Sequence, residues 1–268
     1  MMDYKKLNRE VMVDTKRQYE ALSALKDAIA HSVKNQYMVK HEDVLDGPKE
    51  SDVKTKYVVS GKRTLEAAKY YKGKKVAVLN FANSHTIGGA PFSAGAQEES
   101  ICRCSTLYPC LQAMNEVFYQ RHIRQFEARQ ISEMGNDDLI YTPGVVVFKT
   151  DELADVIYPK MMPEEDWYQV NVITSAAPEL MKMRRVPDDY EQQITSRIKK
   201  ILDVAEKEQT EVLILGAWGC GAFKNPIAVV SKVFHSLLKD YHFEVVEFAL
   251  SQYDVTGSPF TKLFMKID

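Results

Sequence analysis

Short runs rich in valine, isoleucine and leucine alternate with helical patterns along most of the chain. These apolar runs predict strands at 56–60, 75–82, 145–149, 170–176, 212–218 and 244–251. Helical spacing of apolar residues predicts helices at 64–71, 99–129, 188–208 and 225–239. Strands this apolar are typical of a sheet covered on both faces, so the pattern predicts a three-layer α/β/α fold.

A helical segment is expected ahead of this alternation. Asp14 and Thr15 can cap a helix whose apolar positions recur at helical spacing, namely Tyr19, Leu22, Leu25 and Ile29. The polar stretch HEDVLDGPKESDVK follows and contains a Gly-Pro pair, which predicts a connector. We therefore expect an N-terminal helical extension at 1–50 and a main domain at 51–268.

Composition limits the compartment and the partners. No apolar run approaches the roughly 18 to 20 residues of a membrane span, and the opening MMDYKKLNRE lacks the apolar core of a signal peptide. We expect a cytoplasmic protein, or a nuclear one in a eukaryote, with no membrane partner. Residues 1–75 hold 17 Lys and Arg against 11 Asp and Glu, whereas the remainder holds 18 against 26. A basic front can attract a polyanion, but solvated helix faces give the same counts, so a nucleic-acid partner is not required.

Two loops rich in small residues follow predicted strands. The first runs from Gly88 to Glu99, and the second, GAWGCGAF, runs from Gly216 to Phe223. Ligands of open α/β sheets bind beyond the carboxyl ends of the strands, and residues without a bulky side chain let a phosphate approach backbone N–H groups. Two such loops could hold a diphosphate. Tight turns alone would also explain the glycines.

Adjacent glutamates end the first loop, at Glu98 and Glu99. At the start of a helix they can simply complement the helix dipole. In a phosphate-binding loop, however, anionic side chains would repel the ligand, so their presence there favours a functional role. Burial and a neighbouring diphosphate would both raise the pKa of such a carboxyl, which could then act as a general acid at neutral pH.

Three of the four cysteines fall close together, at Cys102, Cys104 and Cys110. On one helix the side chains of Cys102 and Cys104 would point about 200° apart, and no histidine pair completes a tetrahedral zinc site. We interpret the three as small buried side chains, and expect neither a metal site nor a disulfide framework.

These motifs resemble those of the bacterial-type poly(ADP-ribose) glycohydrolases, a family of catalytic macrodomains. The resemblance rests on Gly88-Gly89-Ala90, six further residues and then Gln97-Glu98-Glu99. The stretches SICRCSTLYPCL, IYTPGVVVFK, NVITSAAP and LGAWGCGAFKNP resemble further parts of that family in the same order. The resemblance implies a macrodomain with a mixed central sheet.

The resemblance also implies the ligand and the site. It implies that ADP-ribose lies with its diphosphate between the two loops, that Glu99 is the catalytic residue and that Glu98 positions the ribose of the leaving unit. Asn83 and Phe223 match residues that hold the distal ribose. The other implied binding residues are Gly88, Gly89, Ala90, Gln97, Gly219, Cys220, Gly221 and Ala222. Asn80 is interpreted as structural, and Asp43 and Asp52 are candidate contacts of the adenine.

One position departs from the family pattern. Ala90 stands where a third glycine is usual, and its methyl group would crowd a diphosphate if the residue needed a positive φ or close contact. This departure puts affinity and substrate range in doubt more than chemistry.

The implied reaction is hydrolysis of the ribose–ribose O-glycosidic bonds of poly(ADP-ribose) on modified proteins, which releases ADP-ribose. Glu99 would protonate the leaving oxygen and then activate water, with no metal or cofactor. A mono(ADP-ribosyl) protein hydrolase and a reader macrodomain that binds ADP-ribose without cleaving it are the alternatives. We expect a monomer.

Overall fold

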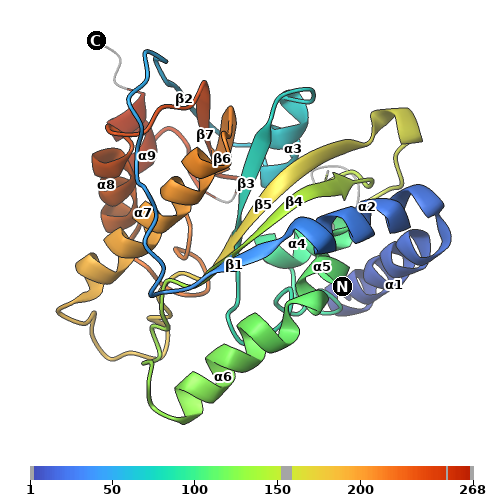
Figure 1. Cartoon of the computed structure of the whole chain (residues 1–268), viewed down its shortest axis with the longest axis horizontal. Helices are drawn as coiled ribbons and strands as arrows, with labels where there is room; N and C mark the ends of the chain where they lie inside the picture. The colour runs from blue at the N-terminus through green and yellow to red at the C-terminus, as the bar shows by residue number, and fades with distance from the viewer. Residues whose placement is uncertain (1–2, 152–158, 252, 266–268) are drawn as a thin grey trace.

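The computed structural model describes residues 3–151, 159–251 and 253–265. Seven strands in these residues form one sheet in the order β1-β4-β5-β3-β6-β7-β2 (Figure 1). They are β1 (Tyr37–Val39), β2 (Lys56–Ser60), β3 (Val76–Phe81), β4 (Leu139–Val147), β5 (Tyr168–Ser175), β6 (Val212–Leu215) and β7 (Val245–Ala249). The predicted α/β fold is confirmed, and the sheet is mixed.

The direction of the strands brings the two small-residue loops together. The five neighbours β5, β3, β6, β7 and β2 are parallel, whereas β4 runs antiparallel to β5 and to β1. The carboxyl ends of β3 and β6 therefore lie side by side at one edge of the sheet. The loops that follow these two strands meet there.

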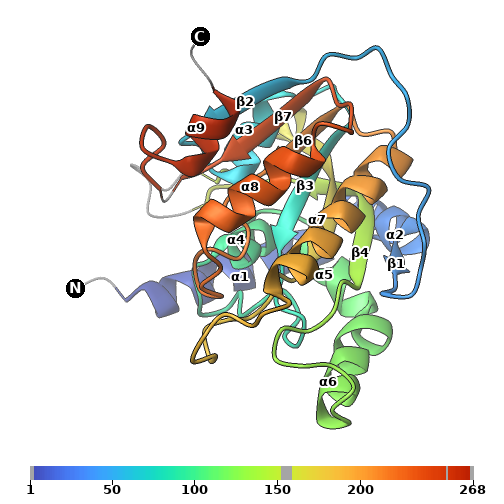
Figure 2. The ribbon, with the colours of Figure 1, turned by 90° about the vertical axis from the view of Figure 1, so that its left-hand side faces the viewer.

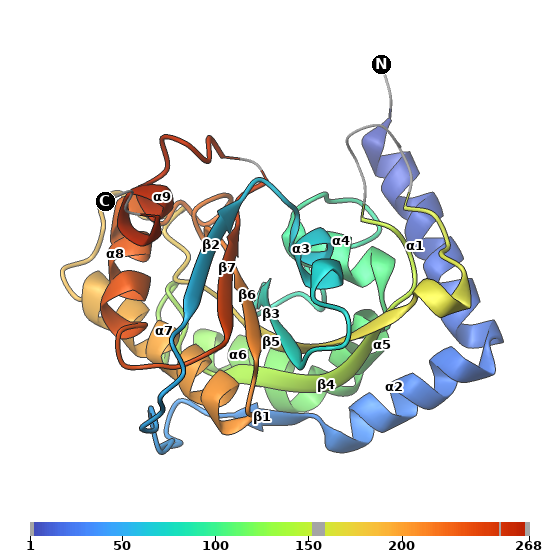
Figure 3. The same ribbon diagram turned by 90° about the horizontal axis from the view of Figure 1, so that it is seen from above.

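Helices cover both faces of the sheet, as Figure 3 shows. One face packs against α7 (Tyr190–Lys207), α8 (Ile227–Leu237) and α9 (Pro259–Phe264). The other face packs against α3 (Thr64–Tyr70), α4 (Gln97–Cys104) and α5 (Leu107–Ala113). In the described part of the chain, no helix combines the length and apolar character needed to cross a membrane.

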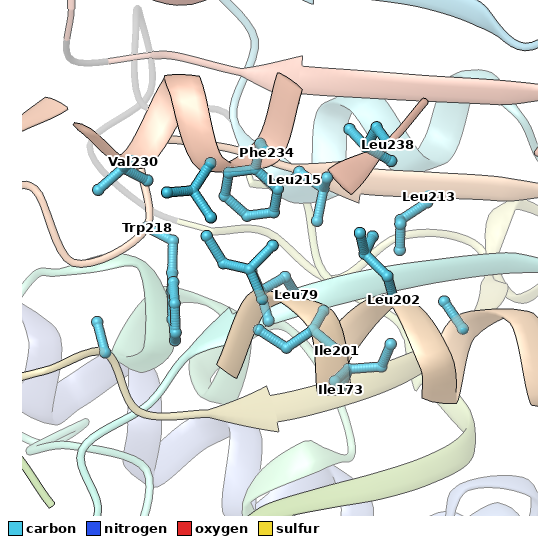
Figure 4. Close-up of a cluster of buried hydrophobic side chains, with 14 of the residues drawn as sticks. Leu79, Ile173, Ile201, Leu202, Leu213, Leu215, Trp218, Val230, Phe234 and Leu238 are labelled. Carbon is cyan, nitrogen blue, oxygen red and sulfur yellow. The ribbon is translucent and has the colours of Figure 1, made fainter. Parts of the chain in front are cut away.

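The larger apolar core lies between the sheet and the first of these helical layers (Figure 4). Leu79 of β3 and Ile173 of β5 meet Ile201 of α7 and Phe234 of α8, and all four side chains are fully buried. Burying a side chain of this size stabilises the fold by roughly 1.5–3 kcal/mol. Trp218 of the second loop belongs to the same core, so that loop is attached to the rigid body of the protein.

The N-terminal helix differs from its prediction. The chain forms α1 (Tyr4–Ala21) and α2 (Ser23–Asn35), with extended backbone at Leu22. Asp3 caps α1 by accepting hydrogen bonds from two backbone N–H groups. The predicted caps Asp14 and Thr15 instead lie inside α1.

These first residues also join the main body. The Thr15 hydroxyl donates to the carbonyl oxygen of Arg103 in α4 over 2.5 Å, and β1 pairs with β4. Because β1 lies before residue 50, the sheet includes part of the segment expected to be an extension. The division at residue 50 stays a prediction.

The helix expected over 99–129 is broken into pieces. After α4 and α5 the chain forms a π-helix at Asn115–Tyr119 and then α6 (Gln120–Glu127), which projects from the body (Figure 2). The break after α4 is caused by β4, because Ser105 is extended and forms a bridge with Val147. The Thr106 hydroxyl in turn accepts the N–H of Val146 over 3.0 Å.

Other predicted elements are present with shifted ends. β4 begins six residues before the predicted start at 145, and β6 ends at Leu215 instead of residue 218. The chain turns at Gly216, where an added Cβ would lie 2.8 Å from the carbonyl oxygen of Ala249. β1, α9 and a short 3-10 helix at Glu164–Asp166 were not predicted.

Candidate active site

A cavity of about 370 Å³ lies at the edge of the sheet where β3 and β6 end. Its volume is within the range typical of small-molecule sites. Ten of the predicted site residues line it, namely Asn83, Gly89, Ala90, Gln97, Glu98, Glu99, Gly219, Gly221, Ala222 and Phe223. Gly88 and Cys220 are not among its lining residues.

Glu99 is a buried residue in the lining of this cavity. It is 7% exposed, and Oε1 accepts a hydrogen bond from the N–H of Ala90 over 3.1 Å. Oε2 is buried and has no hydrogen-bond partner within the described residues. One oxygen therefore fixes the carboxyl group, while the other makes no hydrogen bond within the described protein.

Glu98 is more deeply buried than Glu99, and both of its carboxylate oxygens accept hydrogen bonds. Oε1 accepts the Asn80 Nδ2–H over 3.1 Å, and Oε2 accepts the N–H of Asn83 over 2.8 Å. Burial raises the pKa of the Glu98 carboxyl to about 8, an effect opposed by these two bonds and reinforced by the charge of Glu99. Glu98 is therefore mostly protonated at neutral pH, which removes the repulsion that two adjacent carboxylates would exert on a phosphate.

Asn80 and Gln97 hold α4 against β3. Asn80 is fully buried and bonds Glu98, in agreement with its structural interpretation. The Gln97 Oε1 accepts the N–H of Phe81, and its Nε2 donates to the Leu79 carbonyl oxygen over 2.7 Å. The Gln97 amide thus makes bonds within the protein, although the residue lines the cavity.

The first loop approaches Glu99 closely only because it contains glycine. Gly88 and Gly89 have φ of +64° and +69°, and a Cβ on Gly89 would lie 2.3 Å from the Glu99 Oε1. Ala90 is not among the residues with positive φ, so its methyl group causes no backbone strain. The N–H groups of Gly89 and Ala90 already donate, to the Thr86 carbonyl oxygen and to Glu99.

The second loop contains a cluster of unpaired amides. Among the described residues, the N–H groups of Gly219, Gly221, Ala222 and Phe223 donate to no protein acceptor. A Cβ on Gly221 would meet nothing within 4 Å, so this stretch of backbone faces open space. Neighbouring free amides in such a loop form an anion-binding site.

Two buried side chains fix the shape of the second loop. The Trp218 Nε1–H donates to the Ser175 carbonyl oxygen over 3.0 Å, which ties the loop to β5. The Asn225 Nδ2 donates to the carbonyl oxygens of Pro178 and Gly219 over 2.8 and 3.0 Å. Gly219 has φ of +74°, and a Cβ there would collide with Ala177 at 2.4 Å.

The cavity is also lined by residues that the sequence analysis missed. The Arg63 Nε pairs with the Asp151 Oδ1 at 2.9 Å, and the Ser100 hydroxyl donates to the same oxygen over 2.8 Å. All three line the cavity, as do Leu250 and Tyr253 after β7. Asp151 follows a predicted strand closely, which was the available signal. Asp43 and Asp52 are not among the lining residues.

The cysteines are placed as expected. Cys102, Cys104 and Cys110 are free and fully buried. No group of three or more potential metal-binding side chains occurs among residues 3–151, 159–251 and 253–265.

Comparisons with known proteins agree with this geometry. The structure is similar to that of poly(ADP-ribose) glycohydrolase (PARG) from Thermomonospora curvata, with a TM-score of 0.80, 29% identity and coverage of 97% of this chain and 98% of that chain. The Thermomonospora enzyme bound to the inhibitor ADP-HPD gives a TM-score of 0.78 at 30% identity, with the same coverage. PARG from Deinococcus radiodurans in complex with ADP-ribose gives 0.73 at 26% identity, covering 90% of this chain and 98% of that chain.

A search of curated proteins found no match. The sequence pattern of the microbial-type PARG catalytic domain, in contrast, matches residues 10–150, which is more than half of the chain. This stretch contains both glutamates and the whole first loop. The chain therefore belongs to the family of microbial-type PARG catalytic domains.

Proposed function

We propose that this protein hydrolyses the ribose–ribose O-glycosidic bonds of poly(ADP-ribose) and releases ADP-ribose, with Glu99 as general acid and base. The observation that carries the proposal is the Glu99 carboxyl of the cavity lining, which is held by Ala90 through one oxygen and unpaired at the other among the described residues. Family membership supports the same activity.

The chemistry requires two proton transfers, both through the same carboxyl group. Cleavage of an acetal passes through an oxocarbenium-like state and needs a proton on the leaving oxygen. Glu99 donates that proton as the bond between ribose C1 and the leaving oxygen breaks. The resulting carboxylate then removes a proton from the water that attacks C1, which restores the acid. The substrate's diphosphate, placed beside the ring, stabilises the positive charge that develops there.

The second loop binds the diphosphate in this proposal. Its free amides at Gly219, Gly221, Ala222 and Phe223 are the available donors, whereas two of the three amides at Gly88–Ala90 are already engaged. The glycines of the first loop let its backbone approach the substrate closely. Phe223 lines the cavity next to these amides and packs against the distal ribose.

Glu98 organises the site in this scheme. As a mostly neutral group it holds the N–H of Asn83, and Asn83 in turn accepts the N–H groups of His85 and Thr86 through its Oδ1 over 2.8 and 2.9 Å. The Asn83 Nδ2 remains for a ribose hydroxyl. Leu250 and Tyr253, which also line the cavity, supply apolar surface for the adenine. The macrodomain architecture implied by the resemblance and the monomeric state stay predictions.

The decisive experiment compares the wild-type protein with Glu99→Gln on poly(ADP-ribose), with the products identified by mass spectrometry. The wild type should release ADP-ribose. The variant keeps the shape of the side chain but cannot donate the proton, so its turnover should fall by about 10²–10⁴-fold, while ADP-ribose binding measured by calorimetry persists. Exposed Glu116→Gln is the matched control.

Three outcomes would contradict the proposal. Turnover of Glu99→Gln near the wild-type rate would remove the acid from the mechanism. Wild-type protein that binds ADP-ribose but yields no product after long incubation would be a reader. Release of ADP-ribose from a singly modified protein, with intact polymer left uncut, would identify a mono(ADP-ribosyl) hydrolase.

A further inference from the structure

One flank of α1 is basic over most of its length. At about 100° per residue, five cations fall within roughly 120° of the helix circumference. They are Lys5, Lys6, Arg9, Lys16 and Arg17. The carboxylates of Asp3, Glu10 and Asp14 project from the adjoining sector, whereas Glu20 lies within the flank near the C-terminal end of the helix. The buried residues of α1 include Met12, Thr15 and Tyr19. They project from the sector beyond the basic flank, on the side away from Asp3, Glu10 and Asp14.

The first turns of α1 carry charge that the described residues do not neutralise. Lys5, Lys6 and Arg9 are exposed, and none of them has a carboxylate partner within the described part of the chain. Lys16 and Arg17 differ, because they pair with Glu20 at 3.6 Å and with Asp14. The uncompensated charge is therefore concentrated at one end of the helix.

This end of α1 touches the rim of the cavity. The Asn8 Nδ2 lies on the same helical turns as the three cations and donates to the carbonyl oxygens of Ser93 and Ala94 over 3.2 and 3.0 Å. Gly95, the next residue of that loop, lines the cavity. Figure 2 shows the first turns of α1 extending past α4 at the edge of the molecule.

We propose that Lys5, Lys6 and Arg9 form a binding surface for the part of the poly(ADP-ribose) chain that stays outside the cavity. The proposal rests on the proposed function. The cavity has a volume of only about 370 Å³, so most of a long polymer must lie outside it and leave across the rim. Each unit carries a diphosphate with two negative charges, and exposed cations that neutralise phosphates strengthen binding in a salt-dependent way.

The charge distribution of the chain favours this exit. Residues 76–268 hold 18 Lys and Arg against 26 Asp and Glu, so this part of the chain has a formal net charge of −8. The basic flank of α1 is an exception that lies beside the rim. Long polymer should therefore bind more tightly than a substrate with a single ribose–ribose bond, by contacts that take no part in the chemistry.

The test combines Lys5→Gln, Lys6→Gln and Arg9→Gln. We expect kcat/KM on long poly(ADP-ribose) at low salt to fall about tenfold, with a flatter dependence on salt, because three phosphate contacts are lost. On the ADP-ribose dimer, which has one scissile bond, kcat/KM should stay within about twofold. The matched control is Lys26→Gln, Lys34→Gln and Lys49→Gln, which removes the same charge from exposed positions on α2 and the connector.

Several results would overturn the inference. If kcat/KM fell equally on polymer and on dimer, the three residues would act on catalysis in the cavity and not on the outer part of the polymer. If the control variant lost as much kcat/KM on polymer, the effect would be one of net charge alone. Unchanged kcat/KM on polymer would remove the surface altogether. Affinity for long polymer, measured by fluorescence anisotropy in Glu99→Gln with and without the three changes, tests the surface independently of catalysis. A wild-type protein inactive on both substrates would instead contradict the proposed function.

Discussion

The backbone N–H of Ala90 donates a hydrogen bond to the Glu99 Oε1 over 3.1 Å. The loop after β3 and the first turn of α4 therefore hold each other in place. Gly88 and Gly89 have positive φ and Ala90 does not, so the backbone favours glycine at the first two of these three positions only. Alanine at the third position is therefore compatible with the backbone conformation of this loop.

Gly89 is the position at which an added methyl group should do most harm. Gly89→Ala places a Cβ 2.3 Å from the Glu99 Oε1 at a φ of +69°. We expect turnover to fall by about 100-fold, since a displacement of about 1 Å at a reacting group has this effect, and stability to fall by about 1–2 kcal/mol. Turnover and the melting temperature are the measurements.

Ala90→Gly is the control for this prediction. It keeps the N–H that bonds Glu99, so turnover should change by less than about threefold, with a loss of about 0.5–1 kcal/mol from chain entropy. If Gly89→Ala turned over substrate at the wild-type rate, the close contact with Glu99 would have no catalytic value.

Glu98 should make stability depend on pH. Burial raises its pKa to about 8 in the folded protein, from about 4.5 for an exposed glutamate. Below pH 4.5 both states bind the proton, so the group costs nothing. Between pH 4.5 and 8 the unfolded chain releases the proton and the folded protein retains it, so stability falls as pH rises and levels off above about 8. The loss should amount to a few kcal/mol.

The measurement is the free energy of unfolding in urea at pH 5 and pH 8. Glu98→Gln does not titrate, so its stability should change less over this interval than that of the wild type. Exposed Glu116→Gln should keep the full wild-type change. An identical pH dependence in wild type and Glu98→Gln would show that Glu98 is ionised when folded.

Phe223 should act on substrate binding. It lines the cavity beside the free amides of the second loop and is only half-buried, so truncation leaves the core intact. We expect Phe223→Ala to raise KM about tenfold, and Phe223→Tyr to stay within about threefold, because a ring that packs on a sugar is retained. A KM unchanged in Phe223→Ala, with an unchanged melting temperature, would exclude the ring from the site.

The alternation of apolar runs and helical patterns was enough to predict the layers and six of the seven strands. It failed where distant parts of the chain decide local structure. The helix expected over 99–129 breaks at Ser105 and Thr106 because both residues bond β4, which lies some forty residues away in sequence. β1 is three residues long and is defined only by its pairing with β4.

The candidate site shows the same limit. Motifs identified Glu98, Glu99 and both loops, since the glycines and the paired glutamates are local features. They gave no signal for Arg63, which reaches the cavity from the turn before α3 and pairs with Asp151. Nor could they show that the Gln97 amide is occupied by β3 or that Glu98 bonds Asn83. Those facts depend on packing between elements.

Asn8 should influence the rate from outside the cavity. Its Nδ2 bonds the carbonyl oxygens of Ser93 and Ala94, and the buried Arg103 bonds the Pro91 and Ala94 carbonyl oxygens at the same loop. Asn8→Ala should lower kcat by about five- to tenfold with a stability loss of about 1–2 kcal/mol, because two hydrogen bonds that fix the loop are lost. Asn8→Asp should be worse, since a carboxylate would face two carbonyl oxygens.

The substrate separates this role from that of the neighbouring cations. Asn8→Ala should reduce kcat equally on long polymer and on the ADP-ribose dimer, because loop position affects Glu99 with either substrate. The charge-removing variants of Lys5, Lys6 and Arg9 should affect the polymer alone. Asn35→Ala removes a similar amide bond, to the His31 carbonyl oxygen, on the exposed face of α2, and should leave kcat unchanged. A stability loss in Asn8→Ala with wild-type kcat would limit Asn8 to a purely structural role.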